Sequence, residues 1–180
     1  SGSVGLAGVE LRGFPLPAPP ITDENGNYSV LVNYGWSGSV MPVKPGFKFT
    51  PTARNYPKVT ANMPDENYTA TQLTFTISGS AGQPDVRLVG FLEEVVSDAS
   101  GRYTATVPWG WSGTVIPEKS AWRFDPPSKT YDQVTRDVKD DYKIFEQTFV
   151  ISGSAGAEGV TMKGLPGEPK SGANGAYRVE

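Results

Sequence analysis

The chain has 180 residues, of which 37% are hydrophobic and 19% are charged, and its formal net charge is -3. It has no run of about 18 apolar residues, the length a membrane-spanning helix needs, so we expect no membrane span. It has no His and no Cys, which excludes Ser/His/Asp and Cys/His catalysis, His-ligated metals and thiolate zinc sites. The 16 basic and 19 acidic residues are mixed along the chain, without the basic stripe that follows a phosphate backbone, so we expect no nucleic acid partner.

Glycine (21 residues) and proline (16 residues) together make up about a fifth of the chain. This share is high for a helical protein and lower than in collagen or low-complexity disorder. The 4 Trp, 8 Tyr and 8 Phe residues provide enough bulky apolar side chains to fill cores. The composition therefore favours a folded, turn-rich all-β protein.

An internal repeat organises the sequence. The tripeptide Ser-Gly-Ser begins at Ser1, Ser78 and Ser152. In the first two copies, Tyr-Gly-Trp-Ser-Gly at 34–38 matches Trp-Gly-Trp-Ser-Gly at 109–113. The repeat predicts three units, which are a first β-sandwich over 1–76, a second over 77–150 and the incomplete front part of a third over 151–180.

Apolar residues alternate with polar ones within each copy, as in Tyr103, Ala105 and Val107. This is the period of a β-strand. Turn signals recur about every 8–12 residues, a spacing typical of β-sandwiches. Each full copy is therefore predicted to bury a set of bulky residues at matching positions, namely Tyr28, Val30, Trp36, Val40, Phe49, Tyr56, Val59, Tyr68 and Phe75 in the first copy and Tyr103, Trp111, Val115, Phe124, Tyr131, Val134, Tyr142 and Phe149 in the second.

The order of motifs in a copy is Gly-x-Tyr, then Gly-Trp-Ser-Gly-x-Val-x-Pro, Phe-x-Pro and Tyr-x-x-Val. This order resembles the tandem repeats of bacterial secreted and cell-surface proteins, which are immunoglobulin-like or prealbumin-like sandwiches often grouped with carboxypeptidase regulatory-like domains. The resemblance covers essentially the whole chain. It implies tandem Ig-like or prealbumin-like β-sandwiches in an elongated array and an extracellular or cell-surface location, but no uniform ligand or activity.

The four tryptophans are candidates for a sugar-binding platform, because an indole ring can stack flat on a sugar ring. Their positions favour a core role instead, since packing requires bulk at the same place in every copy. Each has an aromatic counterpart in the other copy, with Trp36 matching Trp111, Tyr34 matching Trp109 and Phe47 matching Trp122. Both interpretations remain open at this stage.

A calcium loop is suggested by oxygen-bearing side chains at Asp23, Asn25 and Asn27. The sixth position of that loop is Tyr28, where an EF-hand loop requires Gly, and no bidentate Glu follows at the twelfth. An Asx turn explains the same residues without an ion. We therefore predict no metal site and no cofactor.

Catalysis would have to come from a pair of carboxylates, as in glycoside hydrolysis. No such pair stands out, because acidic residues of one copy have few counterparts in the other; Glu10, for example, matches Arg87. The sequence therefore predicts a non-enzymatic segment of an extracellular or cell-surface protein that acts as a stiff spacer, stalk or fibre-assembly module. The alternative is a carbohydrate-binding module attached to a secreted enzyme, with a polysaccharide as its ligand.

The junctions between copies predict the partners. The segments 73–78 and 148–152 lead from one copy into the next without a Gly/Ser-rich or Pro-rich linker, so neighbouring repeats should join stiffly. Residues 151–180 hold too few strands to bury a core. They should therefore pair with the second copy, or with another chain in a head-to-tail or strand-exchange assembly. The candidate assembly residues are Val160, Met162, Tyr177 and Val179.

Overall fold

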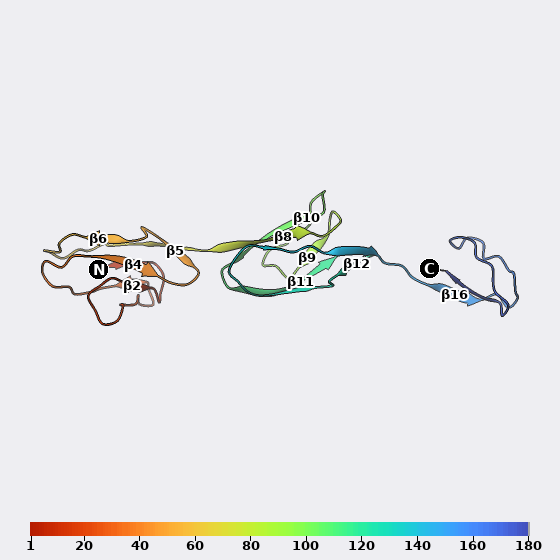
Figure 1. Ribbon diagram of the computed structural model, residues 1–180, viewed down its shortest axis with the longest axis horizontal. Helices are drawn as coiled ribbons and strands as arrows, with labels where there is room; N and C mark the ends of the chain where they lie inside the picture. Colours follow the sequence, from red (N-terminus) through yellow and green to blue (C-terminus); the bar gives the residue numbers. More distant parts are fainter. Residues whose placement is uncertain (180) are drawn as a thin grey trace.

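The computed structural model describes residues 1–179, which form seventeen strands and no helix (Figure 1). The strands form several sheets, none of which closes into a barrel. The predicted all-β class is therefore confirmed. Among the described residues, no helical segment is long and apolar enough to cross a bilayer.

The first repeat, residues 1–72, contains three small sheets. In one sheet β4 (Gly38–Val43) lies between β2 (Glu10–Arg12) and β6 (Arg54–Tyr56). In the others β1 (Gly2–Ser3) pairs with β3 (Asn27–Tyr28), and β5 (Phe47–Thr50) pairs with β7 (Thr69–Gln72).

The second repeat, residues 74–146, follows a similar order of strands, with longer strands at β8, β10, β11 and β13 and with an additional short strand, β14. In one sheet β8 (Thr74–Ser80) lies between β10 (Arg102–Pro108) and β14 (Val138–Lys139). In another, β11 (Trp111–Glu118) lies between β13 (Lys129–Val134) and β9 (Arg87–Val89). A two-stranded sheet joins β12 (Trp122–Asp125) to β15 (Lys143–Glu146).

Each repeat buries its own core, and the two cores are made by matching residues. Leu11 and Val40 are fully buried in the first, as are Leu88 and Val115 in the second. The alternation of apolar and polar residues produces these cores, because successive side chains of a strand point to opposite faces of the sheet. Most predicted core residues are buried, while Val30, Trp36, Val59, Trp111 and Phe124 are partly buried against the cores.

Two predicted core assignments are wrong. Phe75 was expected in the first core but packs against the second, and Phe149 was expected to be buried but is 72% exposed. Both residues lie in segments that run forward into the next unit. The boundary expected between 76 and 77 falls inside β8, all of which pairs with β10.

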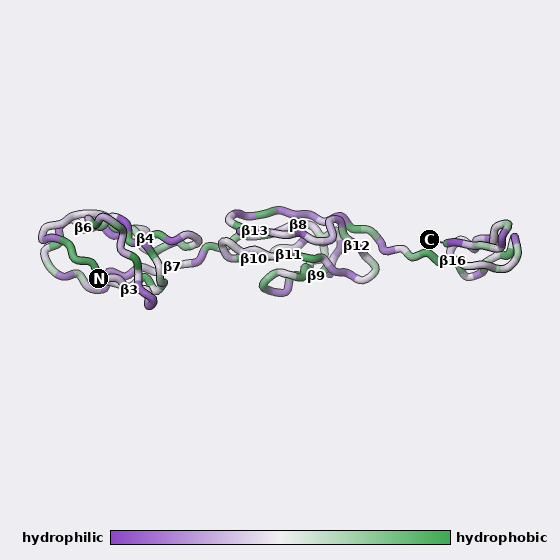
Figure 2. Tube along the Cα trace, turned by 90° about the horizontal axis from the view of Figure 1, so that it is seen from below, coloured by the Kyte–Doolittle hydropathy of each residue, from purple (hydrophilic) through white to green (hydrophobic). Residues whose placement is uncertain are grey.

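The C-terminal segment, residues 147–179, contains β16 (Ile151–Ser154) and β17 (Ala176–Val179), which pair antiparallel. A single bridge joins Thr161 to Lys170. Figure 2 shows hydrophobic residues where the chain enters β16, and Ile151 there is about half exposed. None of the buried hydrophobic residues comes from this segment, so its described part has no buried apolar centre.

Candidate functional site

A groove of about 710 Å³ lies in the first repeat. One wall is the segment 29–34 and the other is the segment 60–64. We call it the first-repeat groove. Its floor is formed largely by side chains of the core and its edge, namely Phe14, Tyr28, Trp36, Tyr56, Val59 and Glu66, with Ser1 at one end.

Both walls carry apolar side chains that the fold leaves uncovered. Leu31 is 94% exposed and Tyr34 is 80% exposed, and Met63 on the facing wall is also exposed. Residues 29–34 form no strand in the described chain, although Val30, Leu31 and Val32 have the composition of one. The groove is therefore bounded by backbone that is not paired in a sheet.

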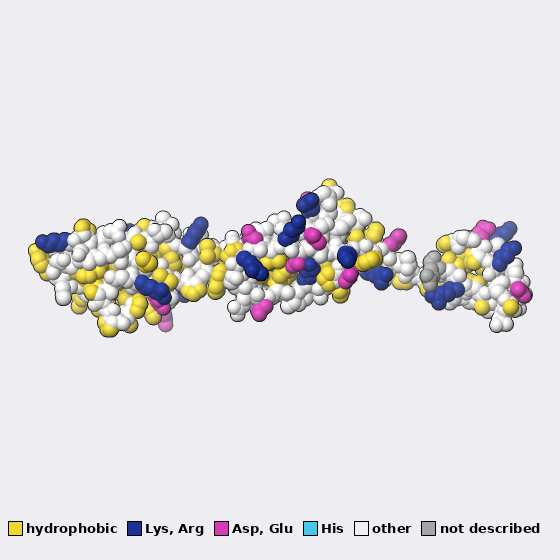
Figure 3. All heavy atoms as spheres, in the orientation of Figure 1, with side chains coloured by type: hydrophobic (Ala, Val, Ile, Leu, Met, Phe, Trp, Pro, Cys, Tyr) yellow, Lys and Arg dark blue, Asp and Glu magenta, His cyan; other side chains and the backbone are white. Residues whose placement is uncertain are grey.

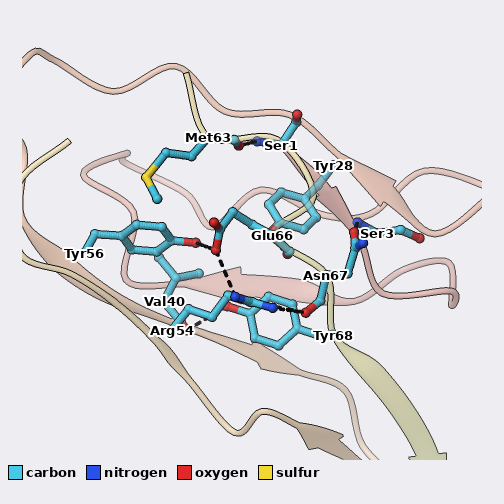
Figure 4. Close-up of polar contacts among 10 residues, drawn as sticks. All are labelled: Ser1, Ser3, Tyr28, Val40, Arg54, Tyr56, Met63, Glu66, Asn67 and Tyr68. Carbon is cyan, nitrogen blue, oxygen red and sulfur yellow. Dashed lines mark hydrogen bonds and ion pairs between the residues drawn. The ribbon is translucent and has the colours of Figure 1, made fainter. Parts of the chain in front are cut away.

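A polar cluster underlies the groove (Figure 4). The Glu66 carboxylate accepts hydrogen bonds from the Tyr56 hydroxyl and the Arg54 guanidinium, both at 3.1 Å. The Tyr28 hydroxyl donates to the Glu66 carbonyl, and the Arg54 guanidinium also donates to the Asn67 carbonyl at 2.7 Å. These bonds fix the segment that carries Glu66 against the core.

Burial weakens the acidity of the tyrosines in this cluster. It raises the pKa of Tyr28 to about 12, and the neighbouring Glu66 carboxylate adds to the rise. The pKa of Tyr68 is also raised to about 12, first by burial and then by Tyr28. Burial likewise raises the pKa of Tyr56 above its usual range. All three hydroxyls are therefore neutral at physiological pH and are poor general bases.

The second repeat contains an equivalent cluster. The Lys129 ammonium takes the place of the Arg54 guanidinium and donates to the Asp140 carboxylate at 2.7 Å. The Tyr103 hydroxyl donates to the Asp140 carbonyl at 2.6 Å, as Tyr28 does to Glu66. Because the arrangement recurs in both repeats, we interpret it as a structural cluster that holds this segment against the core of each repeat. The cluster was not predicted from the sequence, although the basic residues Arg54 and Lys129, which lie 75 positions apart in the two copies, were an available signal.

The predicted tryptophan platform is distributed over different environments. Trp36 stacks on Phe14 with ring centroids 5.8 Å apart, and Trp111 stacks on Phe91 at 5.7 Å. Both are partly buried against the cores. Trp122 is half-buried in β12, while Trp109 is 38% exposed and lies at the junction of the repeats. The four rings do not form one flat face. A sugar-binding platform shared by all four tryptophans therefore stays a prediction, and the structure shows no single surface on which they meet.

The acidic side chains in the turns accept hydrogen bonds from the backbone of the same turns. The Asp23 carboxylate accepts hydrogen bonds from the N–H groups of Asn25 and Asn27, at 2.9 and 2.8 Å. The Asp98 carboxylate accepts from the N–H groups of Ser100 and Arg102 in the same way, and it also accepts from the Ser100 hydroxyl at 2.7 Å. The bond from the Ser100 hydroxyl, followed by the backbone bonds, lowers the pKa of Asp98. Within residues 1–179, no three acidic side chains are gathered closely enough to hold a metal ion.

The predicted assembly residues all lie within the C-terminal segment, and two of them pair in its sheet. Tyr177 lies opposite Gly153 and Val179 lies opposite Ile151 in the β16–β17 ladder. Val160 is 39% exposed, and its N–H donates to the Ser171 hydroxyl at 3.0 Å. The remaining residue, Met162, is partly buried. The structure therefore brings these four residues into one segment, and their role in assembly stays a prediction.

Neither a family model nor a curated protein matches this chain. A solved structure, the Bacillus anthracis TIE protein, is similar over 97% of this chain with a TM-score of 0.61 and 9% sequence identity. The match spans 40% of that protein. At this identity the likeness shows the all-β fold alone.

Proposed function

We propose that this chain is a non-enzymatic structural segment of an extracellular or cell-surface bacterial protein. In this proposal its repeats are Ig-like or prealbumin-like sandwiches in an elongated array, which acts as a stiff spacer, stalk or fibre-assembly module. The motif order that resembles bacterial surface repeats supports the location. The observation that carries the mechanical role is the junction between the first and second repeats.

This junction is short and hydrogen-bonded on both sides. Only Leu73 separates β7 from β8. Its N–H donates to the Gly46 carbonyl of the first repeat at 2.8 Å, and its carbonyl accepts from Trp109 N–H of the second at 2.9 Å. The connecting residue is therefore held by both repeats.

A side-chain contact reinforces the same junction. The Trp109 ring lies so close to Gly46 that an added Cβ would come within 2.9 Å of a ring carbon. Gly46 also has φ +80°, a conformation that glycine adopts readily. Glycine at position 46 thus lets an aromatic ring of one repeat rest on the backbone of the other, which opposes bending.

The second junction provides a natural contrast. Its connecting N–H, on Gln147, donates to the Ala121 carbonyl at 2.7 Å, as Leu73 does to Gly46. Residues 147–150 then form no strand and are exposed. We therefore expect the first junction to be the stiffer of the two.

Spin labels on two introduced cysteines test this proposal cleanly, because the chain has no cysteine of its own. Labels at the exposed positions Asn55 and Asp132 should give a narrow distance distribution across the first junction. The change Trp109→Ala should broaden it, while Ala121→Gly, at the second junction, should leave it unchanged. A broad distribution in the otherwise unaltered chain would contradict a stiff spacer.

Carbohydrate binding is the second candidate, and the exposed Tyr34 ring beside Trp36 in the first-repeat groove is the observation that favours it. A glycan array probed with the whole chain tests it. Specific binding that is lost in Tyr34→Ala, with the fold intact by circular dichroism, would favour a sugar-binding module over a purely mechanical segment.

A further inference from the structure

The second Ser-Gly-Ser motif lies beside the last part of its own repeat. It belongs to β8, which pairs parallel with β14. Beyond β14 the pairing continues, because the Asp140 N–H donates to the Ser78 carbonyl and the Tyr142 N–H donates to the Ser80 carbonyl, both at 2.8 Å. The start of the repeat is therefore hydrogen-bonded directly to its end.

Two aspartate side chains add bonds between the same strands. The Thr76 N–H donates to the Asp137 carboxylate and the Ser80 N–H donates to the Asp141 carboxylate, both at 2.8 Å. A hydrogen bond to an ionised acceptor is stronger than one between neutral groups. Side chains thus serve backbone donors of β8 that face this neighbour. We call residues 76–80 together with 137–142 the parallel patch.

The glycine of the motif allows this close pairing. Gly79 lies opposite Tyr103 of β10, and an added Cβ at position 79 would collide with the Asp140 carbonyl. The Tyr103 hydroxyl donates to the same carbonyl at 2.6 Å. The Asp140 carbonyl therefore lies against the glycine backbone and is held there by the tyrosine.

The first repeat contains the same arrangement. The Ser3 N–H donates to the Asn67 amide oxygen at 2.7 Å, as Ser80 does to Asp141. Gly2 lies opposite Tyr28, whose hydroxyl donates to the Glu66 carbonyl, and a Cβ on that glycine would collide with this carbonyl. The motifs Ser-Gly-Ser and Gly-x-Tyr are thus parts of one structure in both full repeats.

The parallel direction determines how tension reaches the patch. The chain enters the second repeat at Thr74, where β8 begins, and leaves it after Glu146, where β15 ends, toward β16 (Figure 1). Pulling on both sides therefore draws β8 backward and residues 138–146 forward. The two strands would have to slide past each other along their length, which loads all bonds of the patch at once. Strands pulled apart from one end instead lose their bonds one after another.

We propose that the parallel patch bears tension along the chain and sets the force at which each full repeat unfolds. This inference deepens the mechanical role proposed above and rests on it for the source of the load. Forced unfolding is governed by the rate of unfolding rather than by equilibrium stability. The patch therefore sets mechanical strength although it contains only a few of the hydrogen bonds of the repeat.

The first test pulls the full 180-residue chain in two directions by single-molecule force spectroscopy, through handles on introduced cysteines. The chain has no cysteine of its own, and Thr74, Thr135 and Glu146 are exposed. Handles at 74 and 146 load the patch along its strands, whereas handles at 74 and 135 pull both strands from the same end. We expect the force of unfolding to be at least about twofold higher in the first geometry. Equal forces would overturn the proposal.

Two matched variants separate force from stability. Tyr103→Phe removes the bond to the Asp140 carbonyl and should lower the unfolding force between handles at 74 and 146 by about a fifth. Ser97→Ala removes a buried hydroxyl that donates to the Gln83 carbonyl at 2.7 Å, outside the patch. It should destabilise the repeat in denaturant to a similar extent without lowering the force. Equal reductions of force in the two variants would also overturn the proposal.

The results distinguish this inference from the stiff spacer. Equal forces in the two pulling geometries, with a narrow spin-label distribution across the first junction, would overturn the role of the parallel patch and leave the spacer intact. A broad distribution together with the expected difference in force would contradict the spacer and support the patch.

Discussion

The two repeats build matching cores but complete their sheets to different extents. In the second, the seven residues of β8 are all paired with β10, and Val107, opposite Phe75, is fully buried. In the first, the corresponding strand has two residues, and the wall opposite is unpaired. In the second repeat, closure of this sheet depends on residues 74–77, the segment that leads into Ser-Gly-Ser.

The largest effect should come from alkaline pH, which acts on both repeats alike. Burial raises the pKa of Tyr28 and Tyr142 from the ordinary 10.0 to about 12. Stability from the neutral hydroxyls is therefore complete below pH 10 and is lost as the pH rises through about 12. Thermal unfolding followed at intervals from pH 9 to 12.5 should show a falling midpoint in that window, and a constant midpoint would contradict the buried tyrosine clusters.

The next largest effect should distinguish the repeats. Ile77→Ala removes a fully buried side chain of β8 and should destabilise the second repeat by about 2–5 kcal/mol. The first repeat should be unaffected, because Ile77 belongs to the other core. Denaturant unfolding measures this, with Trp36 reporting on the first repeat. Leu31→Ala, at an exposed position, is the control and should change stability by less than about 0.5 kcal/mol.

A smaller difference is expected from glycines in the central strands. A Cβ at Gly79 would collide with the Asp140 carbonyl, and one at Gly2 would collide with the Glu66 carbonyl. Gly79→Ala should cost about 1–3 kcal/mol, because β8 is held along its whole length. Gly2→Ala should cost less, because β1 is short and near the amino end. Equal losses in the two unfolding transitions would argue against this difference.

The smallest effect concerns matched tyrosines in the two polar clusters. Tyr56 donates to Glu66, whereas the hydroxyl of Tyr131 is buried without a hydrogen bond of good geometry. Tyr56→Phe should therefore cost about 1–2 kcal/mol, and Tyr131→Phe should be close to neutral. The two free energies of unfolding, measured side by side, check this contrast.

Much of the fold could be predicted because its signals are local. Alternation of apolar residues, as in β10, indicates strands, and the repeated Gly-Trp-Ser-Gly block aligns the two copies. The same reasoning misplaced Phe75 and Phe149, because alignment assigns a residue to a copy but not to a sheet. Each residue lies in a segment that leads from one repeat into the next. Only the pairing of β8 with β10 shows that Phe75 belongs to the second repeat.

The first-repeat groove could not be predicted for a related reason. Its walls, 29–34 and 60–64, have strand-like or loop-like sequences that match paired segments of the second repeat. Whether they are paired depends on a third segment that is distant in the sequence. The polar cluster at Glu66 was missed because one extra residue in the first copy shifts it out of register with Asp140.

The charged side chains indicate less about function than the strands do. On the face shown in Figure 3, basic and acidic side chains are scattered over the first and second repeats rather than collected by sign. Ion pairs such as Arg12 with Glu10 are exposed, and exposed pairs contribute little to stability.

The parallel pairing of β8 with β14 has a consequence for folding order. Thr76 binds Asp137, which is 61 residues further along the chain. During synthesis, β8 therefore emerges long before its second neighbour exists, and contacts so distant in sequence form slowly. For that interval one edge of β8 is open to any other strand within reach, including a matching segment of a neighbouring molecule. Correct closure of a repeat therefore depends on whether its own late strand pairs with this edge before a strand of another segment or molecule does.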